Sequence, residues 1–290
     1  MSAISLAPAA ETVERAQPRR ARWFKQPALL AGLVLLAIIL FMCIAAPLLT
    51  SYNPDTQNLT ATLQGFSGKH WLGTDQEGRD TFTRLLYGGR TDLQVAFLAV
   101  LFPFVIGTIL GSVAGYFGGW VDIIIMRLVD IVVAFPFFVL IIALVFVLGP
   151  GQRSIYVAIT LVGWVSYARI IRGEILVAKR QEYVLAAQSG GLSNLRIMGR
   201  HLLPNVISQA IIYAMSDIIQ DILAIVTLSY LGLGIQEPTP DWGTMISDGQ
   251  NFLTTHWQLT TIPGIAVILT GLALSLIGDG LTDVMRPGRS

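Results

Sequence analysis

The feature that most constrains this chain is a series of long apolar runs. Residues 28–49 (ALLAGLVLLAIILFMCIAAPLL) contain no charged side chain, and about 20 apolar residues in helical form cross the roughly 30 Å hydrocarbon core of a bilayer. Charged residues make up only 13% of the chain, against 53% hydrophobic residues. This is too little charge to cover the surface of a soluble globule. We therefore predict an all-α membrane protein.

Six transmembrane spans are expected. Their approximate bounds are 28–49, 93–117, 122–149, 154–173, 206–233 and 259–278. The first run has 22 residues and exceeds the roughly 7–15 residues of a secretory signal core, so it is interpreted as a retained anchor. The organisation that follows is a tail (1–27), an anchor (28–49), an outer loop (50–92), a core membrane domain (93–283) and a second tail (284–290).

Basic residues in alternate loops predict the orientation, because Lys and Arg beside short loops resist translocation. With the N-terminus inside, thirteen basic residues fall on the cytoplasmic side and five on the outer side. The inner set is Arg15, Arg19, Arg20, Arg22, Lys25, Arg169, Arg172, Lys179, Arg180, Arg196, Arg200, Arg286 and Arg289, and the outer set is Lys69, Arg79, Arg84, Arg90 and Arg153. Both termini are therefore expected in the cytoplasm.

A polar, glycine-broken stretch at 182–204, which we call the elbow, lies between the fourth and fifth spans. The run EYVLAAQS predicts a helix, Gly190 and Gly191 favour a left-handed end to it, and Ser193 is suited to cap a second helix. Pro204 is expected to break the chain before the fifth span. One apolar edge is expected from Tyr183, Val184 and Ala187, and another from Leu192, Leu195, Met198, Leu202 and Leu203. A simple connector needs only a few residues, so a folded docking surface is the better interpretation.

The elbow resembles the EAA loop of ATP-binding-cassette importer permeases. That pattern has Glu-Ala-Ala, three residues, Gly, and later an apolar residue before Leu-Pro. Ala186, Ala187, Gly191, Leu203 and Pro204 fall on motif positions, and Leu185 stands where the motif has glutamate. The resemblance implies contact with an ATPase. The expected coupling residues are Glu182, Tyr183, Leu185, Ala186, Ala187, Gly191, Leu203 and Pro204.

Four further blocks are similar to the C-type permease subunits of peptide and nickel importers. They are HWLGTDQEGRDTFTRLLYGGR (70–90), GYFGGWVDIIIMRLVD (115–130), LSYLGLGIQEPTPDWGTMISDGQNFL (228–253) and LIGDGLTDVMRP (276–287). The resemblance, over about 25–288, implies a type I importer permease fold with cytoplasmic coupling helices, in the inner membrane. It also implies a B-type permease partner, two cytoplasmic ATPases, an extracytoplasmic solute-binding protein, and import of di-/oligopeptides or a related solute such as nickel.

The chain is not expected to be an enzyme. No G-x-x-x-x-G-K-[ST] phosphate-binding motif occurs in the sequence, so ATP and Mg²⁺ are expected in partner ATPases and no cofactor on this chain. His70, His201 and His256 are expected in separate loops, without metal-ligand spacing. No metal site and no nucleic-acid partner are predicted.

The fifth span carries polar residues at three- and four-residue steps, which places them on about a third of a helix circumference. They are Gln209, Tyr213, Ser216, Asp217, Gln220, Asp221 and Thr227. An aspartate in lipid costs about 2.5–3.5 kcal/mol, so the stripe is expected to line a translocation pathway. Two alternatives remain open. Asp217 and Asp221 are either neutralised packing residues or the ion sites of a secondary transporter.

Smaller predictions concern ion pairing, packing and docking. Arg127 and Asp130, three residues apart in the third span, are expected to pair, and Cys43 is expected to be a packing residue. The outer segment 234–258 has acidic residues and no Lys or Arg. Its docking candidates for the solute-binding protein are Glu237, Asp241, Trp242 and Asp248. The alternative is an ordered lid without a partner.

Overall fold

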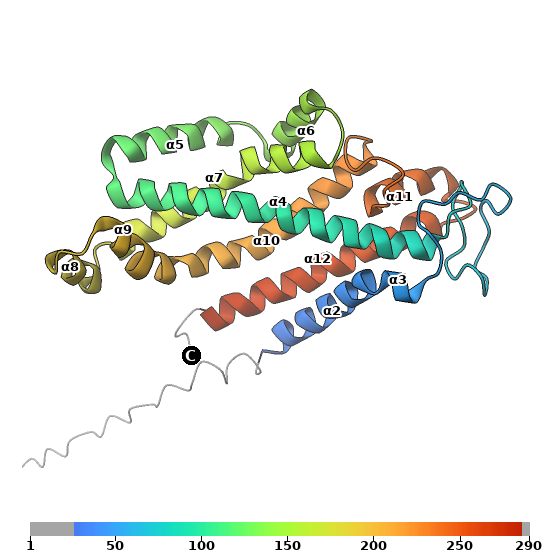
Figure 1. The fold of residues 1–290 in the computed structure, drawn as a ribbon, viewed down its shortest axis with the longest axis horizontal. Coiled ribbons are helices and arrows are strands. Elements are labelled where there is room, and N and C mark those ends of the chain that lie inside the picture. The colour runs from blue at the N-terminus through green and yellow to red at the C-terminus, as the bar shows by residue number, and fades with distance from the viewer. Residues whose placement is uncertain (1–25, 286–290) are drawn as a thin grey trace, which may run out of the picture.

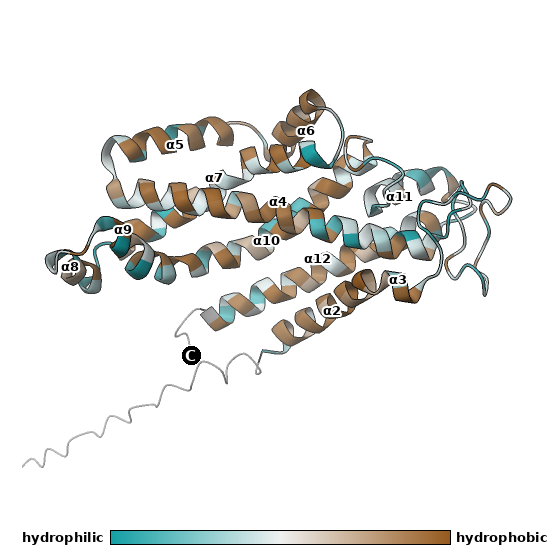
Figure 2. Ribbon diagram, in the orientation of Figure 1, coloured by the Kyte–Doolittle hydropathy of each residue, from teal (hydrophilic) through white to brown (hydrophobic). Residues whose placement is uncertain are grey.

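The computed structural model describes residues 26–285 and shows a bundle of long, roughly antiparallel helices (Figure 1). Five helices are long and apolar enough to span a membrane, and a bent pair forms a sixth candidate, which confirms the six expected spans. The five are α2 (Pro27–Ile44), α4 (Thr81–Phe117), α7 (Gln152–Ala178), α10 (Leu203–Tyr230) and α12 (Gln258–Met285), and the pair is α5 (Gly119–Val133) with α6 (Phe137–Leu148). Apolar residues dominate along these helices (Figure 2). The basic residues predicted at positions 15–25 and at 286 and 289 lie outside the described residues.

Short helices occupy both ends of the bundle. At one end, which we call the elbow end, lie α8 (Glu182–Ser189), α9 (Asn194–Arg196) and the π-helix η1 (Ile197–Leu202). At the other, the loop end, lie α3 (Ala46–Leu49), the segment 50–80, α11 (Trp242–Gly249) and the 3₁₀ helix η2 (Gln250–Phe252). The first residues of α2 and the last residues of α12 lie on the side of the bundle that faces the elbow end (Figure 1). Successive spans therefore alternate in direction along the bundle.

Two helical segments differ from their predicted form. The third span, expected to be continuous over 122–149, is bent by 87° between α5 and α6. Pro136 lies at this break, and its ring and missing N–H disfavour a straight helix through it. The helix that contains the second predicted span, 93–117, begins already at Thr81. Asp80 caps it by accepting a hydrogen bond from the Thr83 backbone N–H at 2.8 Å. The last part of the expected outer loop is therefore helical.

Close packing of α4 on α7 forms the centre of the bundle. Gly107, Gly111 and Gly115 recur every four residues along one face of α4 and meet the backbone of α7. A Cβ atom at Gly111 would lie 2.4 Å from the Ala168 carbonyl oxygen. Small residues at this spacing allow two membrane helices to approach closely.

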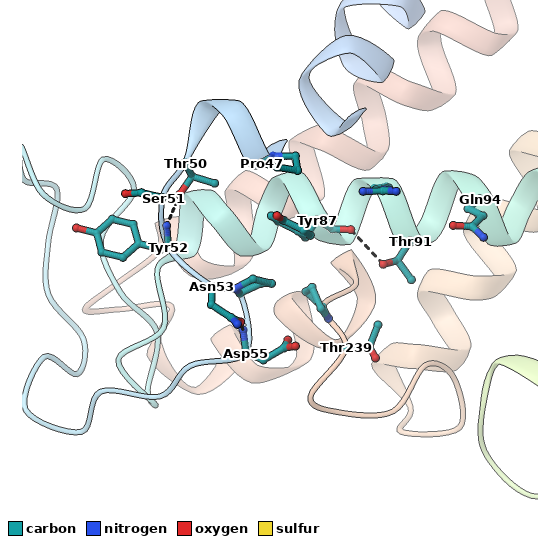
Figure 3. A pocket seen from close by; sticks show the side chains of 13 residues that line it. Pro47, Thr50, Ser51, Tyr52, Asn53, Asp55, Tyr87, Thr91, Gln94 and Thr239 are labelled. Atoms are coloured by element: carbon teal, nitrogen blue, oxygen red, sulfur yellow. Dashed lines mark hydrogen bonds between the residues drawn. The ribbon is translucent and has the colours of Figure 1, made fainter. Parts of the chain in front are cut away.

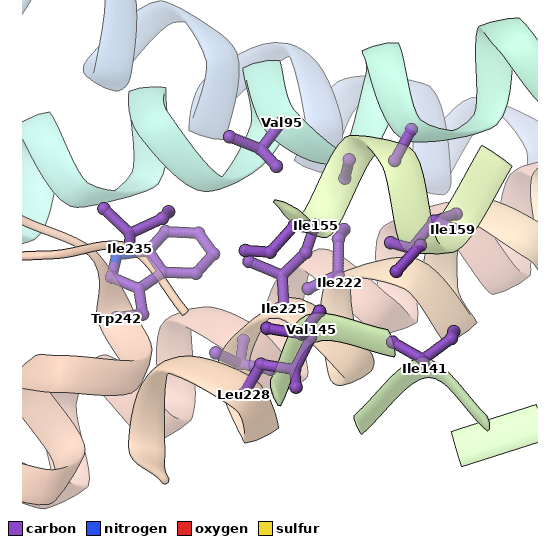
Figure 4. Packing of buried hydrophobic residues seen from close by; sticks show 14 of the residues in the cluster. Val95, Ile141, Val145, Ile155, Ile159, Ile222, Ile225, Leu228, Ile235 and Trp242 are labelled. Carbon is purple, nitrogen blue, oxygen red and sulfur yellow. The ribbon is translucent and has the colours of Figure 1, made fainter. Parts of the chain in front are cut away.

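A second packing region joins the loop-end halves of the helices. Val95, Ile155, Ile222, Ile225 and Trp242 belong to one buried cluster that draws on α4, α7, α10 and α11 (Figure 4). Side chains of α6 complete the cluster. This arrangement fixes α11 against the spans, so the loop end is a packed part of the fold.

Candidate functional sites at the two ends of the bundle

The elbow folds as a helix, a tight turn and a second helix, as predicted. Gly191 has φ +74°, and the Leu192 N–H donates to the Ala187 carbonyl at 3.2 Å. This is the hydrogen bond of a Schellman helix end. Ser193 occupies the capping position of α9 but its side chain makes no capping hydrogen bond.

The predicted break at Pro204 was wrong. Pro204 is the second residue of α10 and directly follows the π-helix η1, and this local change of helix type accommodates its ring and missing N–H without ending the helix. The helical chain is continuous from Asn194 to Tyr230, with η1 joining α9 to the span. His201 consequently lies in η1 and not in a loop. The second half of the elbow and α10 therefore share one helical backbone.

The elbow buries one side and exposes the other. Val184, Ala187, Ile197 and Leu202 are buried in a cluster with residues of α7 and α10. Leu195, expected on the apolar edge, is 79% exposed. Of the predicted coupling residues, Leu203 is half-buried and Ala187 is buried, and the others are exposed: Glu182, Tyr183, Leu185, Ala186, Gly191 and Pro204.

Polar contacts tie the elbow to the ends of the neighbouring spans. The Tyr116 hydroxyl at the end of α4 donates to Asn194 Oδ1 at 2.9 Å. Lys179 Nζ, just after α7, donates to the Gly115 carbonyl at 2.8 Å. The first bond ties the elbow to the end of α4, and the second joins the ends of α4 and α7 just before the elbow begins.

The ion pair expected in the third span does not form. Arg127 and Asp130 are exposed, and within residues 26–285 they are not paired with each other. Asp122, one turn after the start of α5, instead binds Arg172 of α7 through both carboxylate oxygens. A contact between α5 and α7 therefore takes the place of the local pair that was expected within the third span.

The polar stripe of α10 divides between two environments. Ser216, Gln220 and Thr227 are exposed, whereas Asp217 and Asp221 are buried inside the chain. The Tyr167 hydroxyl of α7 donates to Asp217 Oδ2 at 2.7 Å. Gln209 is also exposed, and Tyr213 is half-buried. The aspartates lie at one edge of the stripe, and Asp217 on that edge contacts α7.

At the loop end, acidic residues surround Arg79, which is 2% exposed. Its guanidinium lies 2.6 Å from Asp75 Oδ2, 2.9 Å from Glu77 Oε2, 3.0 Å from Glu237 Oε1 and 3.7 Å from Asp248 Oδ2. We call these five residues the outer charge cluster. It joins segment 50–80 to segment 234–258, two regions far apart in the sequence.

This cluster changes the interpretation of the acidic docking candidates. The sequence showed that 234–258 lacks basic residues, but Arg79 supplies the missing cation from the other loop. Asp241 and Trp242 are buried, so the prediction that they meet a binding protein was wrong. Asp241 caps α11, with its Oδ1 accepting from the Thr244 N–H at 3.1 Å. The backbone N–H of Trp242 donates to Asp92 Oδ2 at 2.9 Å.

The remaining predictions on single residues concern Cys43 and the histidines. Cys43 is buried next to Gly89 and Trp242, as a packing residue. His70 Nδ1 lies 2.8 Å from Asp80 Oδ2. Within the part of the chain that the structure describes, no three His, Cys, Asp or Glu side chains are grouped as metal ligands.

Asp248 makes stability at the loop end depend on pH. Burial, together with the charge of Glu237, raises the pKa of Asp248 from 3.8 to about 6. A raised carboxyl pKa means that the folded state holds its proton longer than the unfolded state. Stability from this group is therefore full below about pH 4 and is lost as the pH rises to about 6.

We expect Asp248→Asn to remove this dependence. The melting temperature of the variant minus that of the wild type should be smallest near pH 4 and should rise by a few degrees to a plateau above pH 6. Thermal unfolding in detergent across this range measures the difference, and titration of other groups cancels in it. A difference that stays constant with pH would contradict the prediction.

Comparison with solved structures identifies the class of protein. The chain superimposes on a chain of "Inward facing conformations of the MetNI methionine ABC transporter" with a TM-score of 0.55 and 18% identity, covering 70% of this chain and 97% of that one. A crystal structure of an amino acid ABC transporter matches with a TM-score of 0.53 and 15% identity, over 68% and 91% of the two chains. The fold is that of a type I ATP-binding-cassette importer permease.

Sequence comparison then identifies the family. Residues 107–290 match the binding-protein-dependent transport system inner membrane component, and 18–65 match the N-terminal TM domain of oligopeptide transport permease C. The chain is 40% identical to the dipeptide transport system permease protein DppC of Alkalihalophilus pseudofirmus (89% of this chain, 85% of that protein). It is 38% identical to the oligopeptide transport system permease protein OppC of Bacillus subtilis (89% and 85%). The chain belongs to this family of multi-pass inner-membrane permeases, and nothing in these comparisons supports an ion-coupled carrier.

Proposed function

We propose that this permease moves di- or oligopeptides, or a related solute such as nickel, into the cytoplasm as one half of a heterodimer with a B-type permease. The support for a peptide substrate is the set of similar proteins, which are dipeptide and oligopeptide permeases. Two ATPases are proposed to bind ATP and Mg²⁺, since this sequence has no phosphate-binding loop. An extracytoplasmic solute-binding protein is proposed to deliver the solute.

The elbow end is proposed to face the cytoplasm, with both termini on that side. The described parts of the inner basic set, such as Lys179, Arg180, Arg196 and Arg200, lie at or beside the elbow. Retention of basic loops on the cytoplasmic side supports this orientation.

The coupling proposal is supported by the structure of the elbow, which has one buried side and one exposed side. Its buried side is fixed to α7 and α10 by Val184, Ile197 and Leu202, while Leu185 and Leu195 are 49% and 79% exposed. Exposed apolar side chains on a rigid support are typical of docking sites. We propose that this surface, with Glu182, Tyr183 and Ala186, seats in an ATPase subunit. Movement of that subunit then displaces α10 through the continuous helix.

We propose that the exposed face of α10 with Ser216, Gln220 and Thr227 contributes to the translocation pathway, against the B-type permease. Polar side chains on the outside of a membrane span avoid lipid by facing protein or water. Asp217 and Asp221 act in this proposal as buried supports of that face, through the contact of Asp217 with Tyr167.

Uptake by the reconstituted complex tests the proposal of ATP-driven import and the proposal that the elbow docks on an ATPase. Uptake of a labelled dipeptide into proteoliposomes should stop when the ATPases lose their phosphate-binding lysine. Leu185→Glu and Leu195→Glu should each reduce uptake at least about tenfold, because charge in a buried contact costs more than about 1.4 kcal/mol.

Leu59→Glu is the matched control, because Leu59 is 74% exposed at the loop end. It should leave uptake and ATPase co-purification unchanged. Full uptake by both elbow variants would refute docking through the elbow, and uptake that survives loss of the ATPase lysine would refute the importer mechanism.

A further inference from the structure

A large polar groove lies at the loop end, outside the charge cluster. It has a volume of about 720 Å³, within the roughly 300–1,000 Å³ range of small-molecule sites. Tyr87, Thr91 and Gln94 follow one another along α4 on one side of it, and Asn53, Asp55 and Thr239 lie across from them (Figure 3). Arg90 also lines the groove.

The walls of the groove are fixed by contacts below its surface. The Thr50 and Thr83 hydroxyls lie 2.6 Å apart, and Arg84 Nη1 donates to the Pro54 carbonyl at 3.1 Å. These bonds hold segment 50–55 on α4. Across the groove, Pro240 precedes the buried Asp241, whose backbone packs on Gly88 of α4. The groove is thus a preformed feature of the fold.

The groove has one cation and one anion that are free to bind a ligand. Arg90 and Asp55 are both exposed. Among the contacts of residues 26–285, the Arg90 guanidinium and the Asp55 carboxylate have no ion pair or side-chain hydrogen bond. The other charged residues nearby behave differently, since Arg79, Arg84 and Asp75 are buried and bound to one another. A ligand with two opposite charges would complement this pair.

We propose that the groove is an entry site where a short peptide rests after its release by the solute-binding protein, with its carboxylate at Arg90 and its amino group at Asp55. The inference rests on the proposed function and assigns to this chain a substrate contact of its own. A free peptide is a zwitterion with the required charges, and polar lining from Asn53, Thr91 and Gln94 suits a peptide backbone. The open, hydrated site binds weakly, as a transfer site must if the solute is to move on.

Peptides with blocked termini test the assignment of each charge. In proteoliposomes containing the complete complex and its binding protein, Arg90→Gln should raise the KM for alanyl-alanine about two- to fivefold, the effect of losing one exposed ion pair. It should leave the KM for alanyl-alanine amide unchanged. Asp55→Asn should raise the KM for alanyl-alanine but not for its N-acetyl derivative. Arg90→Lys should restore most of the loss.

Cysteine protection is the second measurement and does not need transport of blocked peptides. Thr239→Cys places a thiol in the groove, Leu59→Cys places one elsewhere on the loop end, and the native Cys43 is buried. Millimolar alanyl-alanine should slow labelling of Cys at 239 by an impermeant maleimide and leave labelling at 59 unchanged.

The possible outcomes distinguish a failure of the groove assignment from a failure of the proposed function. Equal KM increases for free and blocked peptides, or equal labelling rates at 239 with and without peptide, would overturn the groove assignment. A peptide that protects both thiols equally would indicate a general conformational change and would also overturn it. If the wild-type complex takes up no peptide, the proposed function fails, and the labelling result still decides whether the groove binds one.

Discussion

Replacing Arg79 with alanine is expected to destabilise the loop end by about 3–5 kcal/mol, the usual cost of removing one partner from a buried ion pair. The change leaves Asp75, which is 8% exposed, without its closest cation. It also removes the bonds from segment 50–80 to Glu237 and Asp248. The expected result is a large fall in the melting temperature in detergent and a low yield of folded protein.

Two further variants test whether the loss of stability comes from the lost contacts of the Arg79 guanidinium. Arg79→Lys keeps the charge but loses the planar fork that contacts several carboxylates at once, so it should fall between the wild type and Arg79→Ala. Arg153→Ala removes an exposed arginine at the same end and should change the melting temperature little. A full wild-type melting temperature for Arg79→Ala would show that the charge cluster does not hold the two outer segments together.

Gly111→Leu is expected to separate α4 from α7 and to cost about 3 kcal/mol or more, because an added side chain would overlap backbone that is fixed within a helix. Even a Cβ atom would meet Ala168 O at 2.4 Å and Ala168 Cα at 2.9 Å. The variant should aggregate on size-exclusion chromatography in detergent or melt far below the wild type.

Gly173→Leu is the matched control on the partner helix. Gly173 is an exposed α7 residue, and a Cβ atom there has no neighbour within 4 Å. This variant should elute and melt like the wild type. If both leucine variants behave alike, general intolerance of α-helical glycines, and not the close approach at Gly111, would explain the loss.

The number and type of the spans followed from local properties of the chain. A run such as 28–49 has no stable place except the bilayer, where its backbone must bond internally, and a helix is the form that achieves this. The turn at Gly191 was equally local, because a left-handed helix end favours glycine. The composition of the elbow, and its resemblance to the EAA loop, predicted a docking surface at the same position in the chain.

Other features depended on contacts between segments that no local pattern records. The sequence determined six membrane helices, a helical elbow between the fourth and fifth, and the family to which the chain is similar. Only the tertiary structure decided which charges are paired. Arg79 binds Glu237, 158 positions away, Asp122 binds Arg172 instead of a local partner, and Asp217 accepts a hydrogen bond from Tyr167. The physical reason is that the free energy of a charge depends on the partners and the water around it, and only folding brings those partners together.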